Sequence, residues 1–234
     1  MSAPSGTATT DPVEAGPPPP SGAGVSAQRE YERRRDQREA YARERFPRVG
    51  GLLLKVVPEP QSTTAWEKGA RGERLVGTRL DELADDGVIT LHDRRIPRSR
   101  ANIDHIAVGQ SGIYVIDAKN YTGLVEMRDK GGWLSRDHRL YVNGRDQTAL
   151  SDKLGRQTDT VRQAIGDEHD RIAIHPMLCF ANADFRVFAK PFTIRGVIVT
   201  WPRAMKKLVR SPGDIGTDQI AAIAEMLAQR LPSA

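Results

Sequence analysis

Residues 103–119 read IDHIAVGQSGIYVIDAK, two apolar runs separated by the four residues GQSG. Each run has the length and the β-branched content of a strand, and glycines flanking two polar residues are typical of a hairpin turn. We therefore predict two antiparallel strands, Ile103–Val108 and Ile113–Lys119, joined by a tight turn at 109–112.

The register of this hairpin decides where its acidic residues lie. If the turn is centred between Gln110 and Ser111, residues equally far from the centre pair, and Asp104 lies opposite Asp117. Their Cβ atoms would then be about 4.5–5.5 Å apart on one face of the sheet. Two carboxylates at that distance repel unless a divalent cation lies between them. An odd-length turn would instead put the two acids on opposite faces.

Lys119 follows Asp117 by two residues, so strand alternation places both side chains on the same face. Two carboxylates and a lysine are the groups that metal-assisted phosphodiester hydrolysis uses. The metal polarises the phosphoryl oxygen and activates water, and the cation offsets charge in the transition state. The alternative is a surface Asp–Lys pair on an edge strand.

A carboxylate and an amide interrupt the apolar stripes of two predicted helices. Glu73 precedes Val76 by three residues and Leu80 by seven, although acids seldom face a core unless paired or metal-bound. The alternative for Glu73 is a favourable interaction with the helix dipole in the first turn. Gln157 follows Leu154 by three residues, and a satisfied buried amide and a site role both remain open for it.

Three segments in this order resemble the nuclease-related domain (NERD), a branch of the PD-(D/E)xK, restriction-endonuclease-like superfamily. They are GARGER at 69–74, NIDHI at 102–106 and SGIYVIDAKNYTG at 111–123. The resemblance covers about residues 66–180. It implies an α/β fold with a restriction-endonuclease-like αβββαβ core, a mixed central sheet flanked by helices, Mg²⁺ or Mn²⁺ as cofactor, and DNA as substrate.

The resemblance also implies roles for individual residues. It makes Glu73, Asp104 and Asp117 the metal ligands or site carboxylates, Lys119 the catalytic lysine and Gln157 a supporting polar group. The chain departs from the superfamily pattern at two of these positions. An isoleucine directly precedes Asp104 where the superfamily has proline, and Asp117 replaces the commoner glutamate, whose side chain is one methylene longer.

Composition divides the chain of 234 residues into four parts. Residues 1–27 are rich in Pro, Gly, Ser and Ala, and we expect a disordered tail. Residues 28–48 alternate arginine with acids, which indicates an exposed, ion-paired helix. Residues 49–65 form a linker and residues 66–234 the folded domain. Within this domain we predict helices at 66–84, 148–165 and 217–231, the last capped near Thr217, and further strands at 88–91, 124–127, 139–142, 172–180 and 194–200.

Several classes of protein are excluded or disfavoured by composition. One cysteine, Cys179, allows no disulfide framework within the chain, and we expect it to be a small buried hydrophobe in a reducing compartment. The five histidines lack metal-binding spacing. No run approaches a membrane span, and the N-terminus lacks the pattern of a secretory signal. We therefore expect a cytoplasmic protein without a membrane partner, of undetermined oligomeric state.

The primary hypothesis is a divalent-metal-dependent nuclease that acts on DNA. The net charge of +5 permits contact with nucleic acid without requiring it. One alternative is a catalytically weak or inactive module that binds nucleic acid through Arg and Lys. Another is a protein-interaction role for the charged helix at 28–48. The intact set of acids and lysine favours the nuclease, because carboxylates that face phosphate do not help a pure binder.

Overall fold

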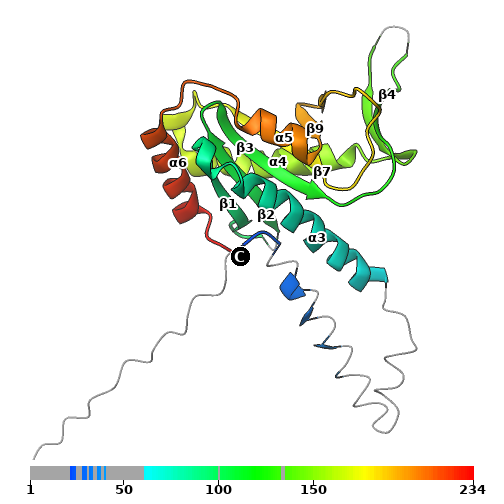
Figure 1. Cartoon of the computed structure of the whole chain (residues 1–234), viewed down its shortest axis with the longest axis horizontal. Coiled ribbons are helices and arrows are strands. Elements are labelled where there is room, and N and C mark those ends of the chain that lie inside the picture. Colours follow the sequence, from blue (N-terminus) through cyan, green and yellow to red (C-terminus); the bar gives the residue numbers. More distant parts are fainter. Residues whose placement is uncertain are drawn as a thin grey trace, which may run out of the picture.

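A mixed six-stranded sheet lies at the centre of the structure, in the order β1-β2-β3-β7-β9-β8 (Figure 1). Its strands are β1 (Ile89–Arg95), β2 (Asn102–Gly109), β3 (Gly112–Lys119), β7 (Ile174–Phe180), β8 (Phe192–Ile194) and β9 (Val197–Thr200). The first three pair antiparallel, β3, β7 and β9 pair parallel, and β8 is antiparallel to β9.

The computed structural model describes residues 22–24, 28–30, 32–33, 36–37, 40, 61–99, 101–132 and 135–234, with side chains from residue 68 onward in the helix that begins at Gln61. Among the helices in these ranges, none is long and apolar enough to cross a membrane.

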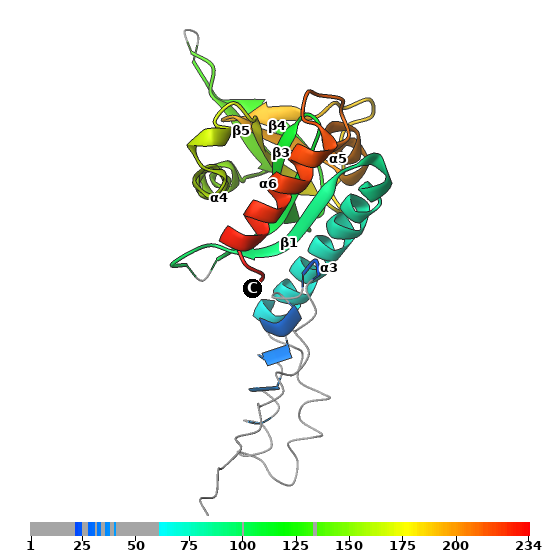
Figure 2. The same cartoon turned by 90° about the vertical axis from the view of Figure 1, so that its left-hand side faces the viewer.

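Helices cover both faces of the sheet (Figure 2). The helices α3 (Gln61–Asp81) and α5 (Pro202–Val209) bury one apolar cluster against it, and α4 (Ala149–Ile165) and α6 (Thr217–Arg230) bury another on the opposite face. Short 3₁₀ turns, η1 (Ala84–Asp86) and η2 (Asp167–His169), follow α3 and α4. The element order from α3 to β7 confirms the predicted α/β fold with its αβββαβ core.

The β2–β3 hairpin has the even-length turn on which the sequence argument depended. Gly109 pairs with Gly112 across the two turn residues Gln110 and Ser111. Gly112 has a φ of 138°, and a Cβ there would lie 2.6 Å from the backbone oxygen of Ala173. Only glycine satisfies both constraints, so the turn length and the register of the acidic residues are fixed together.

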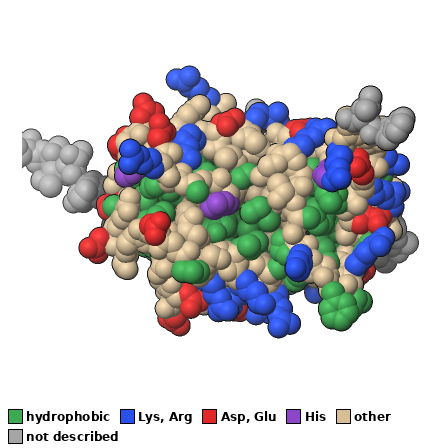
Figure 3. All heavy atoms as spheres, turned by 90° about the horizontal axis from the view of Figure 1, so that it is seen from above, with side chains coloured by type: hydrophobic (Ala, Val, Ile, Leu, Met, Phe, Trp, Pro, Cys, Tyr) green, Lys and Arg blue, Asp and Glu red, His purple; other side chains and the backbone are tan. Residues whose placement is uncertain are grey.

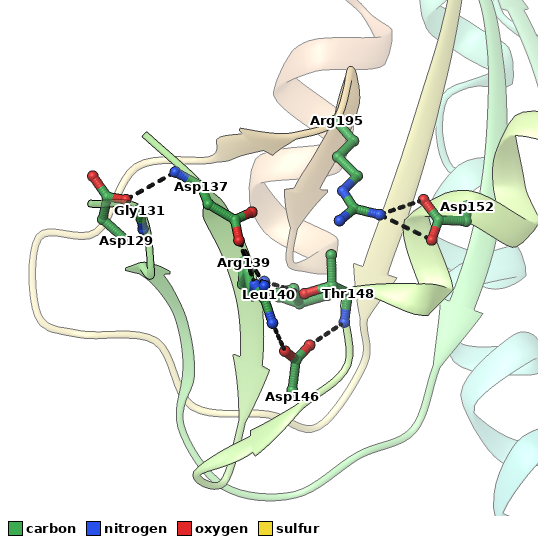
Figure 4. A network of polar contacts seen from close by, with 9 residues as sticks. All are labelled: Asp129, Gly131, Asp137, Arg139, Leu140, Asp146, Thr148, Asp152 and Arg195. Atoms are coloured by element: carbon green, nitrogen blue, oxygen red, sulfur yellow. Dashed lines mark hydrogen bonds and ion pairs between the residues drawn. The ribbon is translucent and has the colours of Figure 1, made fainter. Parts of the chain in front are cut away.

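A second, three-stranded sheet forms an arm beside the main sheet, made of β4 (Val125–Asp129), β5 (His138–Val142) and β6 (Arg145–Asp146). Figure 4 shows how polar contacts fasten this arm to the start of α4. The Leu140 amide donates to Thr148 Oγ1 at 3.1 Å, and the Thr148 amide donates to Asp146 Oδ1 at 2.9 Å. The arm is therefore held at a fixed place relative to the sheet.

Near the C-terminus the structure corrects the sequence predictions at one strand and one helix cap, and it adds a helix. The single strand expected at 194–200 is the β8–β9 hairpin, because Arg195 and Gly196 have φ values of 48° and 80° and turn the chain. The helix α5, which begins with proline, was not expected at all. In addition, no side chain caps α6, whose N-cap residue is Gly216 rather than Thr217.

The predicted N-terminal boundaries also need correction. The helix α3 begins at Gln61, inside the stretch 49–65 expected to be a linker. In the tail expected to be disordered, Gly24 is buried, and a Cβ at this residue would lie 3.0 Å from the Ala70 carbonyl oxygen of α3. The described positions within 28–40 are helical, and the rest of the predicted tail, charged helix and linker lies outside the described residues.

Candidate active site

A cavity of about 920 Å³ opens between the first half of α3, the end of β3 and the β5–β6 part of the arm. Four of the five predicted site residues line it: Glu73, Asp104, Asp117 and Lys119. They come from three separate elements, α3, β2 and β3. The fold thus brings together side chains that are up to 46 residues apart in the sequence.

The two aspartates lie where the backbone pairing of β2 and β3 stops. The last paired residues on that side are His105 and Ile116, and Asp104 and Asp117 are the next positions in the same register. Asp104 Oδ2 accepts a hydrogen bond from the Ala118 backbone amide at 2.9 Å. The Asp104 carboxylate thus takes the place of a backbone acceptor and is fixed against β3.

Lys119 and Asp117 form a short, largely buried ion pair. The Lys119 Nζ donates to Asp117 Oδ1 at 2.5 Å, and their side chains are 22% and 11% exposed. Burial alone would lower the pKa of Lys119, but the charges of Asp117 and Asp104 outweigh burial and raise it. Lys119 is therefore a permanent cation at neutral pH.

One lysine does not neutralise the acids around it. Burial, followed by the charges of Asp117 and Glu73, raises the pKa of Asp104 well above its ordinary value. Burial, followed by the charge of Asp93, raises the pKa of Glu73 to about 7. In both cases burial and neighbouring acids together disfavour the ionised carboxylate, and the nearby cations do not offset this effect.

Besides Glu73, Asp104 and Asp117, a fourth acid lies near the site. This residue, Asp93, was missed by the sequence analysis. The predicted strand ended at Leu91, whereas β1 continues to Arg95, and the pairs on either side of Asp93 place it opposite Asp104. Asp93 is 4% exposed, has a φ of 54°, and accepts a hydrogen bond from Asn102 Nδ2 at 3.1 Å. Had the strand been extended by one alternating step beyond Leu91, Asp93 would have appeared among the candidates.

Small residues in α3 let this helix approach the end of β3. A Cβ at Gly72 would lie 2.8 Å from the Asn120 Cβ, so only glycine fits there. Asn120 then donates to the Lys68 carbonyl oxygen at 2.6 Å and accepts from Asn182 Nδ2 at 2.6 Å. Asn120, which the sequence analysis did not select, thus joins α3 to the residues that follow β3 and β7.

Gln157, the fifth predicted site residue, is not among those that line the cavity. Its Nε2 donates to the backbone oxygen of Asn102 at 3.3 Å, and its Oε1 is buried without a hydrogen-bond partner in the described part of the chain. Gln157 therefore contacts the backbone two residues before Asp104 and not the cavity itself.

The histidine pair packs against α3 near Gly77 and does not line the cavity. His105 is fully buried, and its Nδ1 is 2.8 Å from Nδ1 of His92, whose Nε2 is 2.8 Å from Asp81 Oδ1. Burial, followed by the charge of His92, lowers the pKa of His105 to about 3. His105 is thus a neutral packing residue, and Cys179 is likewise buried.

Three cations surround the acidic centre of the cavity. Lys68 and Arg71 come from α3 and Arg145 from β6, on the arm. All three are exposed, and none makes a side-chain hydrogen bond or ion pair with the residues that the structure describes. They are therefore available to bind an anionic ligand that enters the cavity.

Whether the carboxylates suit a divalent metal depends on their number and arrangement. In the described parts of the chain, no group of three or more His, Cys, Asp or Glu side chains is arranged to hold an ion. However, Mg²⁺ commonly uses only one or two protein carboxylates and keeps water or substrate oxygens as its other ligands. Asp117, which is buried, and Asp104, which is half-buried, supply such a pair of oxygen donors.

Residues 68–181 match the sequence model of the nuclease-related domain, and this range contains the whole acid and lysine set. This part of the chain is a nuclease-related domain. The NERD family belongs to the PD-(D/E)xK superfamily, as the resemblance implied.

An uncharacterized protein of Bacillus anthracis is 29% identical over 85 residues. The match covers 35% of this chain and 37% of the relative's own length, so the chain spans well under half of that relative. No solved structure matches the chain. The NERD assignment therefore rests on the domain match, with which the αβββαβ core agrees.

Proposed function

We propose that the NERD domain is a divalent-metal-dependent nuclease that hydrolyses phosphodiester bonds, with DNA as its substrate. The observation that carries this proposal is the convergence of Glu73, Asp104, Asp117 and Lys119 in one cavity. A domain with only a structural role gains nothing from gathering three acids beside Lys119 in one cavity. Burial, together with repulsion between the acids, raises the pKa values of Glu73 and Asp104, and a cation bound among these acids would favour their ionised forms.

Asp104 and Asp117, with Glu73 nearby, are the residues that would hold Mg²⁺ or Mn²⁺. The hard carboxylate oxygens suit either ion, and the described residues that line this cavity include no cysteine or histidine. When bound, the ion supplies a Lewis acid that polarises a phosphoryl oxygen and lowers the pKa of water.

The remaining residues bind and orient the substrate. Lys119 is held by Asp117, so its remaining N–H groups can donate to a phosphate oxygen and stabilise charge that develops in the transition state. The Ala118 amide holds Asp104 through one carboxylate oxygen, Oδ2. The other carboxylate oxygen does not take part in this bond, and its orientation is fixed by it. Arg71 on α3 and Arg145 on the arm lie at different sides of the cavity, where they can hold phosphates on either side of the scissile bond.

A second candidate function is nucleic-acid binding without cleavage. The unpaired cations around the cavity favour it, because they would bind a phosphate backbone whether or not catalysis follows. The two functions differ in what they require of Asp117, which catalysis needs and phosphate binding does not. A role of the charged helix at 28–48 in protein interaction concerns residues that the structure describes only in part.

The test is cleavage of supercoiled plasmid and of circular single-stranded DNA by the full chain, in EDTA, Mg²⁺ or Mn²⁺. We expect cleavage only with a divalent ion. We also expect Asp117→Asn, purified identically, to cut at least about a hundredfold more slowly, since a lost metal ligand costs several kcal/mol. Equal cleavage by wild type and variant would reveal a contaminant, and absence of cleavage with every metal and substrate would contradict the proposal.

A further inference from the structure

A second cavity, of about 410 Å³, lies next to the candidate active site. Its aromatic wall is formed by Phe185, Phe188 and Trp201, and the rings of Phe185 and Trp201 are 4.7 Å apart. We call it the aromatic pocket. Its volume lies within the roughly 300–1,000 Å³ that small-ligand sites occupy.

The two cavities share one segment of chain, the residues that leave β7. Asn182 lines the candidate active site, whereas its neighbours Ala181 and Ala183 line the aromatic pocket. Consecutive Cα atoms are about 3.8 Å apart, so the two cavities border the same short segment at positions one residue apart. A polymer bound in the active site would have to cross only this segment to reach the aromatic pocket.

The turn that presents Phe188 has two costly features. Phe188 is 97% exposed, and its φ of 64° lies in the left-handed region that bulky residues rarely adopt. A hydrogen bond from the Ala189 amide to the Arg186 carbonyl oxygen, at 2.9 Å, closes the turn. The Arg186 side chain is fastened to the arm by an ion pair with Glu126 at 3.2 Å. Packing does not account for an exposed ring held in this backbone conformation, which points to a ligand.

The chemistry around the pocket favours a nucleic-acid base. Aromatic rings next to arginine are the combination that binds unpaired bases, since each base offers a flat face for stacking. Asp184 also lines the pocket, and its carboxylate can accept a hydrogen bond from an exocyclic amino group. Figure 3 shows hydrophobic side chains standing out beside Lys and Arg side chains at the end of the molecule where β4 and β9 lie in Figure 1.

We propose that the aromatic pocket binds an unpaired nucleobase of the same strand whose phosphates enter the candidate active site. The inference rests on the proposed function for the position of the phosphates, and it narrows the substrate class to single-stranded or locally unpaired nucleic acid. A base inside a duplex is stacked and paired on both sides, so it reaches the pocket only after it leaves the helix.

Binding in EDTA, which blocks metal-dependent cleavage, tests this inference. The affinity of the full chain is measured by fluorescence anisotropy for a labelled single strand and for the matching duplex. The test variant is Phe188→Ala and the matched control is Val187→Ala, which removes an adjacent side chain that is 82% exposed but does not line the pocket. Since both side chains are exposed, both variants should fold as wild type does.

We expect Phe188→Ala to weaken single-strand binding at least about fivefold, the effect of losing one stacked base. Duplex binding should change by less than about twofold, and Val187→Ala should match wild type in both assays. A 2-aminopurine placed in the single strand should change its fluorescence on binding wild type, but not on binding Phe188→Ala.

The inference would be overturned by equal single-strand affinity of Phe188→Ala and wild type, by an equal loss of affinity for duplex, or by no binding of nucleic acid to wild type. A concentration-dependent dimer of wild type that Phe188→Ala abolishes would also overturn it, in favour of contact between two copies. The nuclease proposal fails separately, through lack of metal-dependent cleavage.

Discussion

Replacing Glu73 with glutamine should stabilise the metal-free protein at alkaline pH. The pKa of Glu73 rises from 4.5 in the unfolded chain to about 7 in the folded protein, so the folded state retains this proton between these two values. Stability is therefore lost as the pH rises through that window, and the loss is complete above pH 7. Each pKa unit corresponds to about 1.4 kcal/mol, so the ionised Glu73 destabilises the fold by about 3 kcal/mol.

Glutamine keeps the shape of the side chain without its charge. The advantage of Glu73→Gln over wild type should therefore be about 2 to 3 kcal/mol larger near pH 8 than near pH 5, where Glu73 is mostly protonated in the folded protein. For a chain of this size, that difference corresponds to roughly 5–10 °C in melting temperature. Neutral His105 destabilises the protein in acid, but it does so equally in both proteins and cancels in the comparison.

The assay is thermal unfolding followed by circular dichroism in EDTA, near pH 5 and near pH 8. Glu225→Gln, which changes an exposed glutamate of α6, is the control and should melt like wild type at both pH values. If Glu73→Gln shows the same change in melting temperature at both pH values, the ionised Glu73 is not destabilised by burial and neighbouring acids as we infer.

Three further predictions concern the same cavity. Millimolar Mn²⁺ should raise the melting temperature by mass action, and Asp104→Asn should remove most of that shift; an unchanged wild-type curve would speak against a metal site. Arg145→Ala should weaken DNA binding and reduce the slope of log affinity against log salt by about 0.9, whereas an unaltered slope would place Arg145 outside the phosphate footprint. Gly72→Ala, whose Cβ would lie 2.8 Å from the Asn120 Cβ, should destabilise the fold by about 1–3 kcal/mol in thermal melts. Gly69→Ala should stabilise the fold by about 0.5–1 kcal/mol, because a Cβ at residue 69 would meet no atom within 4 Å. Equal effects of the two substitutions on stability would contradict the close contact between α3 and the end of β3.

The sequence predicts well those parts of the site whose positions depend on a single hairpin or a single helix. A two-residue turn between glycines sets the register of β2 and β3, and the register sets where Asp104 and Asp117 lie. The stripe of α3 places Glu73 toward the sheet because Val76 and Leu80, at helical spacing, are fully buried. Each of these inferences needs only the geometry of one hairpin or one helix.

The parts that sequence missed depend on contacts between distant segments. Asp93 becomes a neighbour of Asp104 only because β1 stays paired with β2 beyond the apolar residues of β1. Asn120 gains its role from Gly72, 48 positions earlier in the chain. The tail residue Gly24 is buried by α3, although nothing in its own composition indicates burial. The composition of a segment indicates how much apolar surface the segment itself can bury. It does not indicate which surface of another segment will pack against it.

The most direct test of the nuclease proposal separates catalysis from binding in one variant. Lys119→Met keeps a long side chain without its charge, and Lys207→Met, on the exposed part of α5, is the matched control. Cleavage is measured with Mg²⁺ or Mn²⁺, and DNA affinity is measured in EDTA at two salt concentrations. We predict that Lys119→Met loses cleavage while it keeps an affinity within a few fold of wild type, because one lysine is a small part of a multi-contact phosphate footprint. Cleavage by Lys119→Met at the rate of wild type and of Lys207→Met would contradict the account.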